Sequence, residues 1–289
     1  MTAVDSTLHQ IEGGNGVRIA VRTAGPEHAP AIVLLHGWAQ SSAAWTAQLA
    51  DPALTSRYRL AAVDLRGHGA SDVPDPETGY SDPEAWADDI AAVLDLVGRP
   101  AILVGWSYGG AVVTDYLRSF GDTDLAGIVF VGASTEVGPN RPGAKVGTAM
   151  RSVVPYVLME DLDVATRGFT EFVRGMAEIH LPGEVSQRVV GDALRVPWQV
   201  RKAVLRRDFD SSGVLALITV PTLVAHGRLD AVIDPSAAEY AHGKIPGAQL
   251  RWFDRAGHMP FAERTEEFDG MLLGFADQVF EQAQEGGRG

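Results

Sequence analysis

Residues 104–110 read VGWSYGG, with a serine between two glycines directly after a short apolar run. A simple turn would account for Ser107, but it would not explain why both flanking positions, Gly105 and Gly109, lack side chains. A Gly-x-Ser-x-Gly sequence between a strand and a helix is typical of a tight, strained turn that exposes the serine hydroxyl above a sheet. Glycines are needed there because side chains would collide where the strand and the helix pass close together. This interpretation requires a buried strand leading into the stretch and a helix after it.

Short, continuous apolar runs recur along the chain. Runs of this length are typical of strands that are buried on both faces of a sheet. The sequence predicts such strands at residues 31–35 (AIVLL), 60–63, 101–104 (AILV), 127–131 (GIVFV) and 222–225, with an alternating early strand at 17–23 and a last strand at 249–253.

Helical patterns lie between these runs. Residues 83–97 repeat apolar side chains at a period of about 3.6 residues, which makes one apolar stripe. Residues 263–281 give a last amphipathic helix. Buried strands that alternate with helices predict an α/β fold, with a mostly parallel sheet and helices on both faces.

One segment, residues 137–213, breaks this alternation because it contains no clear buried strand. Pro155, Pro182 and Pro197 separate short helix-like pieces that are rich in large apolar residues. We interpret the segment as a helical cap inserted over the edge of the sheet. The predicted domains are therefore a core of residues 1–136 and 214–289 and a cap of residues 137–213.

The composition excludes several classes of function. The chain has 289 residues, of which 46% are hydrophobic, and its formal charge is −13. A nucleic-acid-binding protein normally shows a basic face, so we expect no nucleic acid as a partner. Cysteine is absent, which excludes disulfides, a cysteine nucleophile and a thiolate metal site. No metal-ligand cluster, phosphate loop or dinucleotide fingerprint is visible, so we expect no metal and no cofactor.

The chain shows no pattern of a targeting or membrane segment. Its N-terminus lacks the basic and apolar regions of a signal peptide. No apolar run approaches the roughly 18 residues that span a bilayer. We expect a cytoplasmic protein without a membrane span, acting on a small molecule.

Candidate catalytic residues follow three of the predicted strands. Ser107 comes after the strand at 101–104, and Asp230 and His258 come after the last two strands. In an open α/β sheet, ligands bind outside the carboxyl ends of the strands, so these side chains are expected at one edge. A serine hydroxyl is a weak nucleophile that needs a nearby base, and the base needs an orienting group. The order Ser, Asp, His therefore predicts a catalytic triad.

Two other carboxylates compete with Asp230 for the role of the acid. Asp234 precedes Pro235 and a helix-like stretch, and an Asp cap followed by Pro is a common helix start, so we expect it to be structural. Glu136 follows the strand at 127–131 and is the weaker rival, because it lies three residues past Ala133.

Five motifs carry a resemblance to a known family. They are HGW (36–38), DLRGHGAS (64–71), GWSYGG (105–110), HGRLD (226–230) and AGHMPF (256–261). From about Val17 to Phe280 the sequence resembles the α/β-hydrolase family. Within that family it is most similar to bacterial aryl esterases and cofactor-free haloperoxidases, also called perhydrolases.

The resemblance implies roles for individual residues. Ser107 matches the nucleophile, Asp230 the acid and His258 the base of a mechanism with a covalent acyl-enzyme. The backbone N–H groups of Trp38 and Tyr108 match the oxyanion hole. Tyr108 is a departure, since these esterases more often carry Met at that position.

Other polar residues in the motifs are expected to be structural. His36 is expected to hold the oxyanion loop in shape, and Arg66 and His68 lie in a turn marked by glycines. His226 ends a strand and is expected to be buried and hydrogen-bonded. For the Trp38 side chain, both a core position and a place on the pocket wall remain open.

Residue types narrow the function. Dehalogenases and epoxide hydrolases of this fold use an aspartate nucleophile, whereas this chain has Ser107. The resemblance thus predicts a serine hydrolase that cleaves a carboxylic ester, lactone or thioester of a small, fairly apolar substrate. The alternatives are perhydrolase or haloperoxidase-type activity and C–C bond hydrolysis. More remote are a cofactor-free oxygenase or cyclase and a binding module that has kept the fold.

Overall fold

The computed structural model describes residues 6–179 and 181–286, and in this part of the chain one sheet of eight strands forms the centre. The strand order is β1-β2-β4-β3-β5-β6-β7-β8. The strands are β1 (Thr7–Glu12), β2 (Arg18–Ala24), β3 (Ala31–Leu35), β4 (Arg59–Asp64), β5 (Ala101–Trp106), β6 (Leu125–Val131), β7 (Thr222–Gly227) and β8 (Gln249–Phe253). Strand β2 pairs antiparallel with both β1 and β4, and all other pairs are parallel. The predicted mostly parallel sheet is confirmed.

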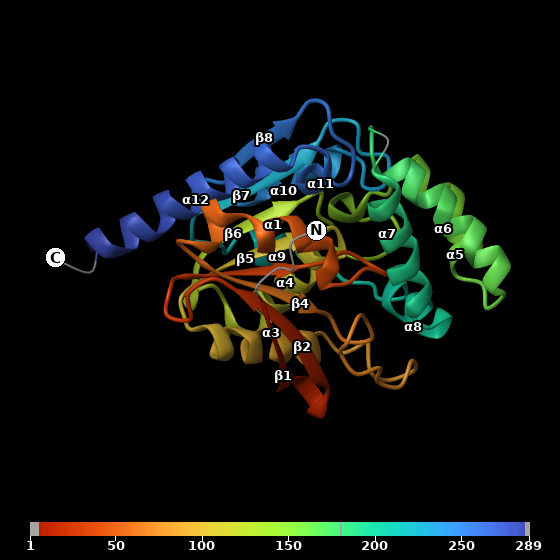
Figure 1. The fold of residues 1–289 in the computed structure, drawn as a ribbon, viewed down its shortest axis with the longest axis horizontal. Helices are drawn as coiled ribbons and strands as arrows, with labels where there is room; N and C mark the ends of the chain where they lie inside the picture. The colour runs from red at the N-terminus through yellow and green to blue at the C-terminus, as the bar shows by residue number, and fades with distance from the viewer. Residues whose placement is uncertain (1–5, 180, 287–289) are drawn as a thin grey trace.

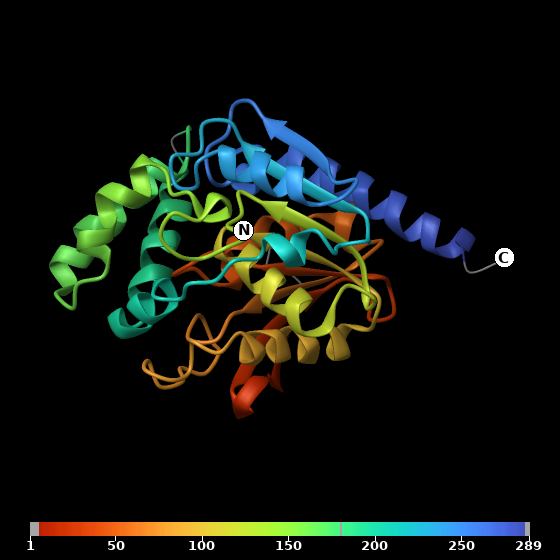
Figure 2. The ribbon, with the colours of Figure 1, turned by 180° about the vertical axis from the view of Figure 1, so that it is seen from behind.

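Helices cover both faces of this sheet. Figure 1 shows α12 and α1 over one face, and Figure 2, the opposite view, shows α4, α9 and α10 over the other. Helix α3 packs against α4. The bounds are α1 (Thr46–Ala50), α2 (Pro52–Thr55), α3 (Pro83–Val97), α4 (Tyr108–Phe120), α9 (Ser212–Leu215), α10 (Ser236–Lys244), α11 (Pro260–Glu263) and α12 (Thr265–Gly286).

The central strands form because their residues are apolar on both faces. Every residue of β3, β4 and β5 is buried, as expected for parallel strands between two helical layers. Strand β1 was not predicted, because its residues are exposed or half-buried and give no apolar run. It is an edge strand, held in place by the register of its pairing with β2.

Helix α3 shows how the sequence sets a helix and its packing. The Asp82 side chain accepts a hydrogen bond from the Glu84 N–H at 3.0 Å, and Pro83 opens the helix. Gly98 ends it with a φ of 93°, a conformation that favours glycine. The apolar stripe is fully buried at Trp86, and burying a large apolar side chain contributes about 1.5–3 kcal/mol.

The last predicted helix is present with shifted ends. It was expected at residues 263–281, and α12 runs without a break from Thr265 to Gly286, while Glu263 ends the short helix α11. Arg264 between them has φ −136° and ψ 51°, which interrupts the helical hydrogen bonds.

In the described part of the segment 137–213, residues 137–147 form a loop with one 3-10 turn at Pro142–Ala144, and the residues from 148 on are mostly helical. Its helices are α5 (Thr148–Val157), α6 (Leu162–Met176), α7 (Gly183–Arg195), α8 (Trp198–Leu205) and the start of α9. In Figure 1, α5 to α8 form the green and teal group to the right of the sheet. They are held to one another by α5 against α6 and α6 against α7. The division of the chain into core and cap domains at these residues remains a prediction.

Across the described residues, every helix is too short or too polar to cross a lipid bilayer.

One buried carboxylate of α12 makes the stability of the fold depend on pH. Asp269 is 5% exposed and accepts a hydrogen bond from the Gln48 side chain of α1 at 2.8 Å. Burial raises the pKa of Asp269 to about 7, helped by nearby Asp51 and opposed by the bond from Gln48. Because an unfolded Asp titrates at about 3.9, the native state retains a proton that the unfolded state has lost between these values. The contribution of Asp269 to stability therefore falls as the pH rises from about 4 through 7.

We expect Asp269→Asn to raise the melting temperature at pH 8 and to change it little at pH 4. The amide keeps an oxygen for Gln48 but has no charge to bury. Thermal melts of both proteins at the two pH values test this. Glu266→Gln, an exposed change on the same helix, is the control and should shift both melts alike. An equal shift for Asp269→Asn at pH 4 and pH 8 would contradict the argument.

Candidate active site

The turn between β5 and α4 is strained at its central residue. Ser107 has φ 54° and ψ −119°, a conformation that is unfavourable for residues with a side chain. Its backbone is held on both sides: its N–H donates to the Val131 carbonyl, and its carbonyl accepts from the N–H groups of Gly110 and Ser134, each at 3.0 Å. These hydrogen bonds stabilise a backbone shape that Ser107 would not adopt alone.

The two flanking glycines are required by the closeness of neighbouring backbone. A Cβ atom on Gly105 would lie 2.8 Å from the backbone of Gly109. A Cβ atom on Gly109 would lie 2.6 Å from the carbonyl oxygen of Leu35 in β3. Both distances are shorter than a carbon atom tolerates. The close passage of strand and helix expected from the sequence is therefore present.

His258 and Asp230, which follow β8 and β7, are hydrogen-bonded to each other. The His258 Nδ1 lies 2.8 Å from Asp230 Oδ2. The other carboxylate oxygen accepts from the N–H groups of Val232 and Ile233 at 2.8 and 3.0 Å. A second imidazole, His226, places its Nε2 3.1 Å from Asp230 Oδ2. The carboxylate is thus fixed from four directions.

Asp230 keeps its negative charge although it is buried. Burial by itself would raise its pKa, but the charges and hydrogen bonds of His258 and His226 outweigh that cost. They hold the pKa of Asp230 well below its usual range. An ionised carboxylate at Nδ1 favours the tautomer whose proton is on Nδ1, so Nε2 of His258 can accept a proton.

Ser107 and His258 line the same cavity, which has a volume of about 450 Å³. Apolar side chains from the helices of residues 137–213 form much of the cavity wall: Met150, Val154, Phe172, Met176 and Leu205. The described residues contain no hydrogen bond between Ser107 and His258. Such bonds are often long in an enzyme without substrate and shorten when the substrate binds.

The loop of His258 is anchored to its surroundings by backbone groups. The His258 N–H donates to the Met176 carbonyl at the end of α6, at 2.6 Å. The indole N–H of Trp106, at the end of β5, donates to the His258 carbonyl at 2.9 Å. The histidine is therefore connected both to the sheet and to the helical segment that covers it.

The two predicted oxyanion residues also line this cavity. Tyr108 is the first residue of α4, where the N–H has no acceptor within the helix. Trp38 follows β3, and its indole N–H donates to the Arg201 carbonyl of α8 at 3.0 Å. The Trp38 side chain is 6% exposed and packs on Phe169 and Phe172, so it belongs both to the core and to the cavity wall.

Two buried histidines shape the loop that carries Trp38. His36 Nδ1 donates to the Gly37 carbonyl at 2.8 Å, and its Nε2 accepts from the Leu65 N–H at 3.0 Å. His68 Nε2 accepts from the Ala39 N–H at 3.2 Å. Burial lowers the pKa of His36 to about 4 and that of His68 to about 3, so both rings are neutral. Their hydrogen bonds are structural, as the sequence predicted.

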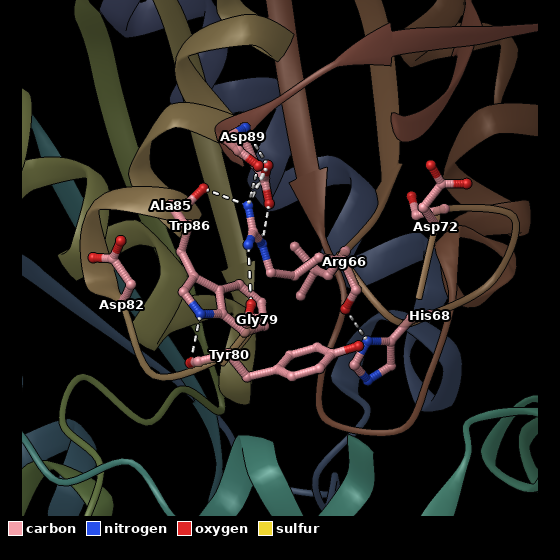
Figure 3. Close-up of polar contacts among 12 residues, drawn as sticks. Arg66, His68, Asp72, Gly79, Tyr80, Asp82, Ala85, Trp86 and Asp89 are labelled. Carbon is pink, nitrogen blue, oxygen red and sulfur yellow. Dashed lines mark hydrogen bonds and ion pairs between the residues drawn. The ribbon is translucent and has the colours of Figure 1, made fainter. Parts of the chain in front are cut away.

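Arg66 fixes the neighbouring loop to α3. Figure 3 shows its guanidinium against the Asp89 carboxylate, at 2.7 and 2.8 Å, with further bonds to the carbonyls of Gly79 and Ala85. The Arg66 carbonyl accepts from His68 Nδ1 at 2.9 Å. Arg66 supports the loop through His68 and does not line the cavity.

The rival carboxylates have other partners. Asp234 accepts from the N–H and the hydroxyl of Ser236 at the start of α10, at 3.0 and 2.6 Å. Glu136 lines the cavity, but its oxygens accept from the Gly143 N–H at 2.8 Å and the Tyr240 hydroxyl at 3.0 Å. Among the described residues, neither carboxylate is bonded to His258. Asp230 is therefore the carboxylate that contacts the histidine.

Within the residues that the structure describes, no three histidine, aspartate or glutamate side chains gather as metal ligands would.

The comparisons with known proteins identify the family. Residues 32–269 match the family model described as the alpha/beta hydrolase family, so the chain belongs to the α/β hydrolases. The predicted family, fold and ester-cleaving hydrolase class are confirmed at this level.

Individual relatives agree with this assignment. The structure of the esterase RhEst1 from Rhodococcus sp. ECU1013 is 39% identical, with a TM-score of 0.87, and the match covers 94% of this chain and 99% of that one. The structure of a bromoperoxidase from Bacillus anthracis is 23% identical, with a TM-score of 0.81, and the match covers 94% of this chain and 100% of that one. At this identity the likeness concerns the fold alone. A pimeloyl-acyl-carrier-protein methyl ester esterase from Vibrio campbellii is 27% identical over 86% of this chain and 94% of its own length.

The sequence analysis did not predict two of the contacts near the site. His226 was expected to be buried, but its contact with Asp230 was not foreseen, although the four-residue spacing in HGRLD brings them close. Arg207 was missed entirely, and it donates to the Tyr108 hydroxyl and to Asp115. Asp115 could have indicated such a partner, because a charged residue within the apolar run of α4 needs a group of opposite charge when it is buried.

We expect Asp230→Asn to lower kcat by a factor on the order of 10² to 10⁴, because the charge that orients His258 is lost. Asp234→Asn should change kcat and stability little, since Asn caps a helix about as well as Asp. Steady-state kinetics and thermal melts of both variants provide the measurement. Equal losses of kcat, or the larger loss at Asp234, would remove Asp230 from the role of the acid.

Proposed function

We propose that this protein is a serine hydrolase that cleaves carboxylic esters through an acyl-enzyme, with Ser107, His258 and Asp230 as its catalytic triad. The observation that carries the proposal is that His258, which lines the same cavity as Ser107, is paired with the ionised Asp230. The strained backbone of Ser107 adds support, since strain of this kind concentrates at functional sites.

The first half of the reaction forms the acyl-enzyme. His258 Nε2 accepts the hydroxyl proton of Ser107 while the serine oxygen attacks the ester carbonyl carbon. Asp230 stabilises the imidazolium that results. The carbonyl oxygen becomes an oxyanion and accepts hydrogen bonds from the backbone N–H groups of Trp38 and Tyr108, and one such donor is worth about 10²- to 10³-fold in kcat.

The second half releases the acid. The tetrahedral intermediate collapses, the alcohol leaves with the proton of His258, and the acyl group stays on Ser107. Water then attacks the acyl carbon while His258 accepts its proton, and the carboxylic acid departs as Ser107 regains a proton. No group beyond these residues and water is needed to balance the reaction.

The cavity favours a small, fairly apolar substrate. A volume of about 450 Å³ and a wall of aliphatic and aromatic side chains suit an ester, lactone or thioester of modest size. The helices of residues 137–213 act as a cap that supplies this wall. The esterase names of two relatives support ester cleavage, and the pimeloyl group in the name of one of them has an aliphatic chain.

We expect Ser107→Ala to fold and to lose kcat for p-nitrophenyl esters by at least about 10³-fold, because the nucleophile is removed. A fluorophosphonate should label the wild-type protein and not the variant. Ser152→Ala, which removes an exposed hydroxyl on α5, is the matched control and should keep labelling and turnover. Turnover by Ser107→Ala above a few per cent of wild type would exclude Ser107 as the nucleophile.

We expect Met150→Ala to shift the preferred acyl chain of p-nitrophenyl esters to greater length. Met150 is a buried residue of α5 that lines the cavity, and its truncation enlarges the space for the substrate. The measurement is kcat/KM for acyl chains from acetate to laurate. Val153→Ala, a buried change on the same helix outside the cavity wall, should destabilise the protein and leave the preference unchanged. A shift with Val153→Ala alone would mean that the substrate lies elsewhere.

A further inference from the structure

Tyr108 is held by a buried arginine from the helical segment that covers the sheet. Arg207 donates from Nη1 to the Tyr108 hydroxyl at 2.8 Å and from Nη2 to Asp115 Oδ1 at 2.7 Å. The side chains of Arg207 and Asp115 are 2% and 0% exposed. Tyr108 and Asp115 lie about two turns apart on one side of α4. We call these three residues the Arg207 brace.

Aromatic rings enclose the guanidinium of the brace. It lies 4.6 Å from the ring centre of Phe209 and 5.3 Å from that of Trp86 in α3. Trp86 also meets the Tyr108 ring edge to face, at 5.7 Å. Tyr108 is therefore fixed at its hydroxyl by a hydrogen bond and at its ring by Trp86, which Figure 3 shows beside Arg66.

The brace connects the cavity wall to the start of α4. Leu205, two residues before Arg207, lines the cavity. Phe209, two residues after it, forms backbone hydrogen bonds in both directions with Val137, which also lines the cavity. The chain that carries Arg207 thus lines the cavity before the arginine, at Leu205, and is bonded to a cavity-lining residue after it, at Phe209.

Stability alone is a poor explanation for this arrangement. Burying an arginine–carboxylate pair costs desolvation free energy that the attraction within the pair barely offsets, and apolar replacements are often as stable. Here the hydrogen bonding that would offset this cost is incomplete, because Asp115 Oδ2 and Arg207 Nε have no hydrogen-bond partner among the described residues. Burial raises the pKa of Asp115 to about 6 in spite of the adjacent guanidinium. A role in holding geometry accounts for the pair better.

We infer that Arg207 is a positioning residue: through the Tyr108 hydroxyl it holds the first residue of α4, so that the Tyr108 N–H stays directed at the oxyanion. This inference rests on the proposed function, which assigns that N–H to the oxyanion hole. It also couples the cap to the reaction, since the segment that carries Arg207 forms part of the cavity wall.

Tyr108→Phe is the sharpest test, because it removes the bond to Arg207 and keeps the ring, the N–H and the ion pair. We expect kcat for p-nitrophenyl butyrate to fall on the order of 10-fold with KM within about 2-fold, as for an interaction made in the transition state. The affinity of a trifluoromethyl ketone, which adds to the serine and forms an oxyanion, should fall by the same factor. A purely structural role would leave both values unchanged in the folded protein.

The control is Tyr58→Phe, which removes a phenol contact with Asp277 at the far end of the sheet. It should lower the melting temperature and leave kcat and inhibitor affinity as they are. Arg207→Lys tests the other partner, since a lysine lacks the two-pronged geometry of the guanidinium. Combined with Tyr108→Phe, it should cost no more than the larger single change, because both remove the same contact. Losses that multiply in the double variant would contradict a common contact.

The outcomes separate this inference from the proposed function. If Ser107→Ala is inactive and folded Tyr108→Phe keeps its kcat and its affinity for the ketone, the brace has no positioning role. A change confined to KM would mean that the Tyr108 side chain only contacts the bound substrate, and it would also overturn the inference. If Ser107→Ala remains active, the proposed function itself fails. Should Arg207→Lys not fold, Tyr108→Phe alone decides.

Discussion

The site depends on how closely three backbone segments pass one another. Strand β5 runs directly into α4, and the first turn of α4 passes beneath the end of β3, where a Cβ on Gly109 would meet the Leu35 carbonyl at 2.6 Å. Only glycine fits at Gly105 and Gly109, and the strain is then concentrated at Ser107 between them. A small enlargement at either glycine would push the helix from the sheet, and with it the serine and the N–H of Tyr108.

The parallel sheet brings the other site residues close to Ser107. Strands β5, β7 and β8 run in the same direction, so their following loops reach one edge, although Ser107 and His258 are far apart in the sequence. The order of adjacent strands matters, because β6 separates β5 from β7. The loop after β6 fills that space with Ser134, whose N–H holds the Ser107 carbonyl. Each site residue is thus fixed by backbone bonds before substrate binds.

The sequence predicts those parts of the protein that follow from local pattern. The buried strands are apolar runs, and Ser107, Asp230 and His258 lie in the loops that follow three of them, so topology brings them to one edge. The sequence does not predict β1, whose residues are exposed, or the partner of Tyr108. Arg207 lies outside any motif, 99 residues from Tyr108, and the packing of the helical segment decides where its side chain goes. Such a contact has no periodic signature.

Two buried arginines, Arg66 and Arg207, both contact the Trp86 ring, and their partners differ in a way that separates an anchor from a positioning residue. Arg66 meets Asp89 with two hydrogen bonds and gives its other donors to backbone carbonyls, so its charge is fully compensated. Arg207 leaves its own Nε and one oxygen of Asp115 without partners, yet it keeps a bond to Tyr108. Complete compensation suits a residue that only holds a loop. An incompletely compensated charge that still contacts the proposed oxyanion residue is better explained by the geometry it imposes on the reaction, because the fold alone gains little from it.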